Sequence, residues 1–363
     1  MFVFLLWRFY ANKSKKVDCD SVIKICINWA LSRSERVDYL KDLLSHPDVD
    51  KCSHRCLDSV VNTNLVNLLS NADIKLLMSR LSYKHTVAVI GGWDDYGLQS
   101  QTFTINTQDG SVTKSKLPGL LVRNEAARCV TSEGLLFSAG GGTRQDKYEH
   151  TKEASLFNPY THEVVTRLPD LPVPVRCAAA VCVGDRVYVL GGEVTERMML
   201  FIDLRYDKTW RRLPDMPMVS YCPMAWAVGD EIFILADMHL QSYNTVNGEW
   251  SLLSSPAGRT SDTYKAFIVP VRKDVYLIGG EDRVNLRYTY ADDAWEVLSQ
   301  PEQDHCGGSG VYIDGKIYIS GGYDQVVPDV VTLVEEYDIA TDTWRKSWFK
   351  LPKPLIGHFT FAL

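Results

Sequence analysis

The sequence predicts a mostly β protein in which a unit of four short antiparallel strands is repeated six times, as in a β-propeller. Three observations predict it. Glycine pairs follow short apolar strands at five places, an aromatic residue precedes a tryptophan by seven positions in three repeats, and proline-bounded segments separate successive units. Successive copies begin 42 to 51 residues apart. A fixed period in this range is typical of repeat architectures.

The glycine pairs end the second strand of each predicted unit. Glycine suits a sharp turn at a point where a side chain would collide with the neighbouring unit. One copy between Gly192 and Gly279 is degenerate, with Ala236-Asp237 in the glycine places. The five intact pairs are Gly91-Gly92, Gly140-Gly141, Gly191-Gly192, Gly279-Gly280 and Gly321-Gly322.

The spaced aromatic residues mark the third and fourth strands. The residues between them are rich in Asn, Asp, Gly and Thr, as hairpin turns require. The second copy has Phe157 and Val164 at these places, and the third has Trp210 without an aromatic partner. The complete pairs are Tyr243 with Trp250, Tyr288 with Trp295, and Tyr337 with Trp344.

The proline-bounded segments, such as LPDLP and LPKP, end the outer strand, because proline cannot continue a ladder of hydrogen bonds. A strand of small apolar residues follows and suits the crowded centre of a propeller. The first copy lacks such a strand before Gly91, but the C-terminal segment Gly357–Leu363 has this character. We expect that segment to pair into the first unit and close the ring, which removes open sheet edges.

Together, the glycine pairs, the spaced Tyr and Trp and the LP exits resemble the kelch repeat over about residues 82–363. The resemblance implies a six-bladed kelch β-propeller, and the count of copies agrees with it.

Residues 20–81 have a different period. Val22, Cys26 and Trp29 recur at spacings of three and four, which marks amphipathic helices. Together with the pattern of Arg and Leu over 36–44, this segment resembles the C-terminal part of a BACK domain. In BTB-BACK-kelch proteins that helical module precedes the propeller, so the order of segments resembles a kelch-like protein.

The kelch-like resemblance implies a protein–protein interaction module that recognises substrates for a cullin-3 RING ubiquitin ligase, and hence a role in ubiquitination. In the family, a BTB domain and the first half of BACK hold cullin-3. Only residues 1–19 precede the BACK-like helices here, too few for a domain. Two interpretations stay open: an incomplete chain, which is favoured, or a short form that binds a partner without recruiting a ligase. An actin-binding, cytoskeletal or scaffold protein is the alternative.

Bulk composition narrows the partners. The net charge of −6 disfavours a nucleic-acid partner.

Residues 1–19 are left unassigned, since their apolar run has neither the flanks of a signal peptide nor the length of a membrane span. Nine cysteines in no regular framework indicate reduced thiols and a cytoplasmic location, with the nucleus left open. Cys177, Cys182 and Cys222 are expected to be small buried residues on inner strands.

No catalytic residue, metal site or cofactor is predicted, and an enzyme is the least favoured class. Cys52, His54 and Cys56 lack the second ligand pair that a zinc site needs. A Cys306 nucleophile beside His305 would lack an identifiable group to orient the imidazole. The glycine pairs lead into hairpins rather than helices, so they do not form a phosphate-binding loop.

The resemblance implies that a partner binds at one face of the propeller near its central channel. Residues just after each glycine pair and just before each inner strand would form that face. Arg176 is the one clear arginine of the second set, so a strongly acidic partner peptide is not expected. Aromatic residues with an arginine are typical of binding hot spots. The predicted partner-binding residues are Trp93, Tyr96, Glu125, Arg144, Arg176, Glu193, Tyr221, Tyr264, Arg283, Cys306, Tyr323 and His358.

Overall fold

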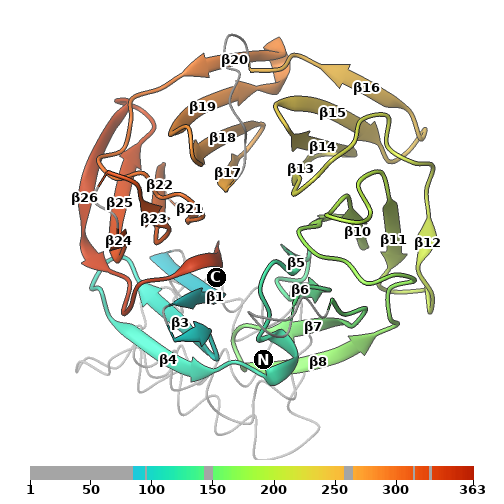
Figure 1. Ribbon diagram of the computed structural model, residues 1–363, viewed down its shortest axis with the longest axis horizontal. Helices are drawn as coiled ribbons and strands as arrows, with labels where there is room; N and C mark the ends of the chain where they lie inside the picture. Colours follow the sequence, from blue (N-terminus) through green and yellow to red (C-terminus); the bar gives the residue numbers. More distant parts are fainter. Residues whose placement is uncertain (1–84, 95, 143–149, 257–264, 314, 327–328) are drawn as a thin grey trace, which may run out of the picture. The chain divides into compact units, whose positions relative to one another are not determined.

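A computed structural model describes residues 85–94, 96–142, 150–256, 265–313, 315–326 and 329–363. These residues form six antiparallel sheets of four main strands each. Figure 1 shows the sheets as blades around a central axis, with the first strand of each blade innermost. The predicted six-bladed propeller is therefore confirmed. The BACK-like helices predicted over 20–81 lie outside the described residues.

The strands follow the same order in each blade, from the centre outward. Blade 1 contains β27 (Ile356–Ala362), β1 (Thr86–Asp94), β3 (Gln101–Asn106) and β4 (Val112–Lys116). Blade 2 contains β5 (Ala127–Val130), β6 (Leu136–Ala139), β7 (Ala154–Asn158) and β8 (Glu163–Leu168). Blade 3 contains β9 (Ala179–Val183), β10 (Arg186–Leu190), β11 (Met199–Asp203) and β12 (Arg211–Arg212).

The remaining blades repeat the arrangement. Blade 4 contains β13 (Met224–Val228), β14 (Glu231–Ala236), β15 (His239–Asn244) and β16 (Trp250–Leu253). Blade 5 contains β17 (Ala266–Val271), β18 (Asp274–Gly279), β19 (Val284–Thr289) and β20 (Ala294–Val297). Blade 6 contains β21 (Ser309–Ile313), β22 (Lys316–Ser320), β25 (Leu333–Asp338) and β26 (Thr343–Lys350). The minor elements are β2 (Gly97–Leu98), β23 (Tyr323–Asp324), β24 (Asp329–Val330), η5 (Gly119–Leu121) and η6 (Tyr290–Asp292).

The position of a strand within its blade explains its composition. The second strands, such as β6 and β10, are covered on both faces by neighbouring blades and are almost entirely buried. The outer strands, such as β4 and β8, are mostly exposed and polar. Charged side chains on these outer strands discourage pairing with another chain. Continuous apolar runs therefore mark the second strands, as the sequence predicted.

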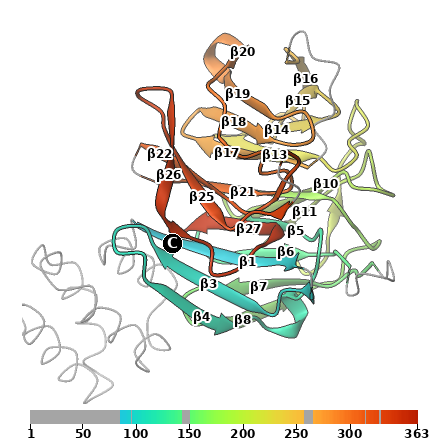
Figure 2. The same ribbon diagram turned by 60° about the vertical axis from the view of Figure 1, so that its left-hand side comes forward.

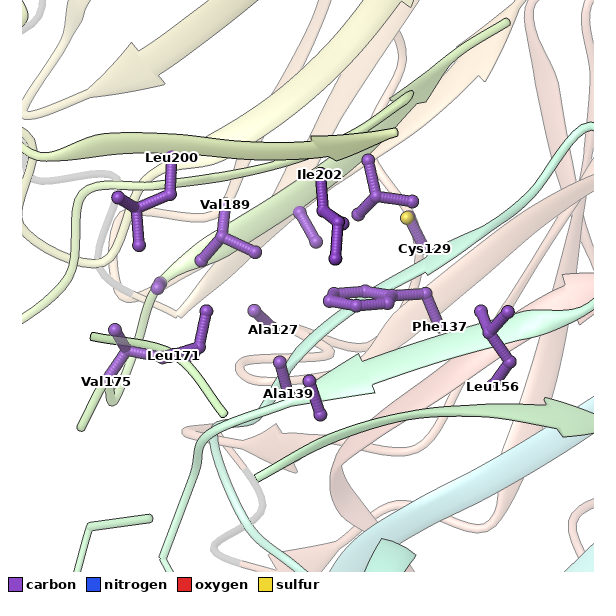
Figure 3. Packing of buried hydrophobic residues seen from close by; sticks show 14 of the residues in the cluster. Ala127, Cys129, Phe137, Ala139, Leu156, Leu171, Val175, Val189, Leu200 and Ile202 are labelled. Atoms are coloured by element: carbon purple, nitrogen blue, oxygen red, sulfur yellow. The ribbon is translucent and has the colours of Figure 1, made fainter. Parts of the chain in front are cut away.

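The core lies between the blades. Figure 3 shows the packing of blade 2 against blade 3, where the ring of Phe137 from β6 lies beside Ile202 from β11. Cys129, Val189 and Ala127 belong to the same buried cluster. Small residues occupy the inner strand β9 of blade 3, where the sheets converge. Each blade interface is thus a separate layer of apolar side chains, and its integrity depends on both neighbours.

The glycine pair of blade 2 shows why these positions exclude a side chain. Both residues have left-handed backbones, with φ of 67° at Gly140 and 83° at Gly141. A Cβ on Gly140 would lie 2.5 Å from the carbonyl oxygen of Val175 in the crossing to blade 3, and a Cβ on Gly141 would lie 2.5 Å from that of Asn124 in its own blade. The predicted collision with the neighbouring blade is therefore present at the first glycine, while the second allows close contact within the blade.

The degenerate copy in blade 4 uses a different turn. Asp237 and Met238 both have left-handed φ values, of 47° and 64°, and Ala236 pairs directly with His239. Two left-handed residues between paired strands are typical of a type I′ hairpin. Blade 4 therefore replaces the glycine pair and its loop with a two-residue turn.

The spaced aromatic residues are cross-strand neighbours, as in the pair of Tyr337 and Trp344, whose ring centroids lie 4.8 Å apart. The indole also joins two blades: Trp344 Nε1 donates to the carbonyl oxygen of Ser299 at 2.9 Å, in the exit from blade 5. Trp295 and Trp210 make the corresponding bonds to the exits of blades 4 and 2. The period of the tryptophans thus follows the contacts between successive blades.

The C-terminal strand closes the ring. Strand β27 pairs antiparallel with β1, from Val87 opposite Ala362 to Trp93 opposite Ile356. Figure 2 shows the two strands side by side. The closing strand also contacts blade 6, where the Nε2 atom of His358 lies 3.0 Å from the Ser320 hydroxyl. The predicted closure is confirmed, and β27 joins the first blade to the last.

The buried His358 imidazole is expected to make the propeller less stable in mild acid. Burial, assisted by the nearby His305, lowers the pKa of His358 from about 6.5 to about 3. Between these values the unfolded chain binds one more proton than the folded chain, so the free energy of unfolding falls as pH decreases. From pH 7 to pH 5 we expect a loss of about 2 kcal/mol from this residue.

Urea unfolding of the wild type and His358→Gln at pH 7 and pH 5 measures this loss. The pKa of His162 is also lowered by burial, and its contribution has the same sign. The contribution of His162 is the same in both proteins, so it cancels when their losses of stability between pH 7 and pH 5 are subtracted. An equal loss of stability in both proteins would contradict the assignment to His358.

Candidate functional site

The two predicted sets of residues lie at one end of the propeller, which we call the loop face. Strands alternate in direction, so the segment before each inner strand and the connection after each second strand meet at the same end. Backbone bonds join the two sets. The Glu193 amide donates to the Arg176 carbonyl at 3.0 Å, and Cys306 and Tyr323 exchange bonds of 3.0 and 2.9 Å. The structure therefore brings these sequence-predicted positions together.

A left-handed residue precedes the inner strands on this face. Cys177 and Cys222 have φ values of 51° and 44° and lie just before β9 and β13. They are only partly buried, as is Cys182 on β9. The expectation that these cysteines are buried residues is therefore wrong, and the first two are not on strands. Their small apolar neighbours resemble strand sequence, but the chain turns at these positions before pairing begins.

Arg176 is held between two carboxylates. Its guanidinium forms an ion pair with Glu125, and its Nη1 atom donates to Glu193 at 2.9 Å. Burial alone would lower the pKa of Arg176, but the bond to Glu125 and the nearby negative charges raise it, so the group stays charged. Three of the predicted residues thus form one cluster between blades 2 and 3. Its sum of formal charges is negative.

The same pairing recurs around the loop face. Asp94 accepts a bond of 2.7 Å from Lys353, and Lys265 lies 3.3 Å from Glu281. Burial, which alone raises the pKa of Asp94, is outweighed by Lys353 and the Tyr96 amide, so this pKa is lowered. Further ion pairs join Arg283 to Asp304 and the buried Arg123 to Glu153. These basic groups already have acidic partners within the described chain.

Apolar and aromatic side chains are exposed between these ion pairs. Tyr96 is 98% exposed, and Tyr221 and Tyr323 are 39% and 37% exposed. Val194 and Val326 are 76% and 69% exposed. Trp93 is half-buried beside the closing strand, where it pairs with Ile356. Large apolar surfaces on a rigid face are the usual basis of a protein interface.

Two predicted partner-binding residues are not on the surface. Cys306 is 3% exposed and His358 is 5% exposed, so their side chains pack inside the propeller. Both lie on segments that cross the face, but their side chains point between blades 5, 6 and 1. Their assignment to the partner-binding face is corrected to a packing role. Arg144 and Tyr264 lie outside the described residues.

A central channel opens along the propeller axis. It has a volume of about 680 Å³ and is lined by residues of all six inner strands, β5, β9, β13, β17, β21 and β27. Most of its wall is apolar, as the small residues Ala178–Ala180 illustrate. The loop face surrounds one mouth of this channel.

His305 and Cys306, the pair considered for covalent chemistry, are neighbours on the segment before β21. The ring nitrogens of His305 lie 2.8 Å from the Gly321 carbonyl oxygen and 2.9 Å from the Glu335 carboxylate. Neither nitrogen is left to accept a proton from Cys306, whose pKa is raised by burial. Within the described part of the chain, no three His, Cys, Asp or Glu side chains converge as metal ligands do. The Cys52–Cys56 segment lies outside it.

The described residues also contain no helix with the length and apolar character needed to cross a membrane.

Several residues of the loop face were missed by the sequence reasoning. Asp304 and Lys353 form ion pairs there, and Val194 and Val219 are exposed there. Their distance from a glycine pair places them in the right loops. Only the packing of one blade on the next shows which side chains pair and which reach solvent.

Comparisons with known proteins agree with the geometry. The kelch motif model matches residues 305–347, and a model described as a protein of unknown function, DUF1668, matches residues 95–255. Kelch-like protein 23 from Pongo abelii is 23% identical over 71% of this chain and 39% of its own length. Kelch-like protein 21 from Danio rerio is 28% identical over 35% of this chain and 20% of its own.

Among solved structures, one titled "Structure of YjhT" has a TM-score of 0.59 at 14% identity. The match covers 72% of this chain and 94% of that one, and it supports the fold. The parts of this chain that align with kelch-like proteins 23 and 21 span less than half the length of those two relatives.

Six four-stranded blades with kelch signatures around a central channel define a kelch β-propeller. Together with the kelch motif and the likeness to kelch-like proteins, they support a protein of the kelch-like family. It is a protein–protein interaction module.

Proposed function

We propose that the loop face binds a protein substrate and that the propeller serves as the substrate-recognition part of a cullin-3 RING ubiquitin ligase. The observation that carries the proposal is the exposure of Tyr96, Tyr221 and Tyr323 on one rigid face. The segments of Tyr221 and Tyr323 are anchored by backbone bonds between the two sets, so little ordering is needed there when a partner binds. The likeness to kelch-like proteins 21 and 23 supports the same function. A cytoplasmic location, with the nucleus left open, is part of the proposal.

Affinity purification followed by mass spectrometry tests the binding face. Tyr96→Ser/Tyr323→Ser removes two exposed aromatics from it. Tyr206→Ser/Val246→Ser is a matched control, since these side chains are 79% and 77% exposed on turns at the opposite end. We expect the first variant to lose at least about tenfold in partner recovery, as aromatic hot spots do. Equal recovery with both variants would contradict the assignment.

Probing the recovered complexes for cullin-3 tests the ligase part of the proposal separately. A partner that is recovered and ubiquitinated with cullin-3 supports the adaptor function. The cells used should express every form of the protein. A partner that is recovered from them without cullin-3 would contradict the ligase part of the proposal and leave partner binding as the function. Co-sedimentation with actin filaments tests the cytoskeletal alternative.

A further inference from the structure

The connection after β10 and the segment before β13 form a rigid ridge on the loop face. Ser220 donates through its amide to the Glu196 carbonyl and accepts from the Gly192 amide, at 2.9 and 3.1 Å. The Met216 amide donates to the Arg197 carbonyl at 2.9 Å. Residues 192–197 and 216–220 are therefore bonded along their length.

A buried glutamine supports the ridge from within blade 4. Gln241 on β15 is 1% exposed, and its side chain bonds both the amide and the carbonyl of Met218, at 3.1 and 3.3 Å. Its Nε2 atom also donates to the Ser220 hydroxyl at 3.2 Å. This bidentate contact holds the segment in one conformation before any partner arrives.

The ridge presents apolar side chains to solvent. Val194, Val219 and Tyr221 are 76%, 40% and 39% exposed, while Met216 and Ser220 are fully buried. The connection of blade 3, residues 191–198, is long, but that of blade 4 is the two-residue turn at Asp237 and Met238. No long connection of blade 4 therefore stands over the ridge.

The charges around the ridge are acidic. Glu193 and Glu125 share the single guanidinium of Arg176, which leaves one negative charge in excess. Glu196 is exposed and has no ion pair among the described residues, while Arg197 is committed to the carbonyls of Met216 and Pro217 at 3.1 and 2.7 Å. Bonds to neutral carbonyls leave the charge of Arg197 in place, so the three carboxylates and two guanidinium groups together carry one negative charge in excess. A lysine or arginine of a partner is therefore favoured here over a carboxylate.

We propose that this ridge docks a segment of the partner protein in which a large apolar side chain stands next to one or two basic residues. The apolar side chain packs on Val194, Val219 and Tyr221, and the basic residues pair with Glu193 and Glu196. The inference rests on the proposed function of the loop face and adds the chemistry of the partner to it.

Binding of two pools of fluorescent peptides to the full chain tests the proposal. Both pools carry Leu, Phe or Trp at the centre, flanked by Lys and Arg in one and by Asp and Glu in the other. We expect the basic pool to bind at least about tenfold more tightly, and to weaken with added salt. The acidic pool binding as tightly, or neither pool binding, would overturn the proposal.

Two charge-matched variants locate the binding. Glu193→Gln/Glu196→Gln is expected to weaken the basic pool about tenfold, and Tyr221→Ser by a similar factor. Glu163→Gln/Glu249→Gln makes the same change in net charge away from the loop face and should leave the Kd within about twofold. Equal weakening by both pairs would overturn the site, and thermal melting confirms that each variant is folded.

The two proposals fail separately. If Tyr96→Ser/Tyr323→Ser leaves partner recovery intact, the proposed function fails. If that variant abolishes recovery but the basic pool binds no better than the acidic pool, the loop face stands and the inferred partner chemistry fails.

Discussion

A chain that ends at Pro354 is expected to lose the cooperative unfolding of the propeller and to aggregate. The deletion removes β27, and with it the ladder along β1 from Val87 to Trp93 and the buried side chains of Leu355 and Phe361. Two such side chains contribute about 3–6 kcal/mol by burial alone. That is a large part of the roughly 5–15 kcal/mol by which a domain is stable. The exposed β1 edge is also apolar, which favours association.

Thermal melting with light scattering compares the truncated chain with the wild type and with a chain lacking only Leu363. The shorter deletion removes one backbone bond, from the Leu363 amide to the Thr86 carbonyl, and keeps β27. We expect it to melt within a few degrees of the wild type. An unchanged melting temperature in the chain ending at Pro354 would show that β27 is dispensable.

The second large effect is expected at the first glycine of a pair. Gly140→Ala places a Cβ 2.5 Å from the Val175 carbonyl oxygen, on a backbone that already has a positive φ. The left-handed conformation costs about 1–2 kcal/mol for alanine, and overpacking against backbone adds about 1–3 kcal/mol. The melting temperature should fall by about 10 °C for a loss of this size.

Gly184→Ala and Gly229→Ala are matched controls for this prediction. Both glycines have positive φ, 58° and 61°, but a Cβ at either would meet no atom within 4 Å. Their free energy of unfolding should fall only by the cost of the left-handed backbone, about 1–2 kcal/mol. Urea denaturation of the three variants separates the two effects. If all three lost equal stability, the contact between blades would contribute nothing.

The fold could be predicted because its signals are local. Each glycine pair marks a strand end that touches another backbone. The Trp residues of blades 3, 5 and 6 mark a bond to the preceding blade, as at Trp344 and Ser299. Closure could be predicted because the first unit lacked an inner strand and Gly357–Leu363 resembled one. Turn geometry was harder: only the structure shows that Asp237 and Met238 form a two-residue turn in place of a glycine pair.

The candidate site could be predicted only by position. Counting from the glycine pairs placed Arg176, Tyr221 and Tyr323 on the loop face, but the same counting included the buried Cys306 and His358. Whether a side chain is buried depends on how closely neighbouring sheets converge, and a spacing along the chain does not show this. The cysteines before β9 and β13 were misplaced for a similar reason, since their left-handed turns have no distinct sequence signal.

By itself the sequence determined the number of blades, the strand order and the segments that form the loop face, because these depend on a period and on residues with unusual backbone freedom. The tertiary structure decided which charges remain available. Arg176 meets Glu125, 51 residues away, and Glu193 only because blades 2 and 3 pack together. An isolated arginine would favour an acidic partner. Its pairing with two carboxylates leaves one negative charge in excess, which favours a basic and apolar partner.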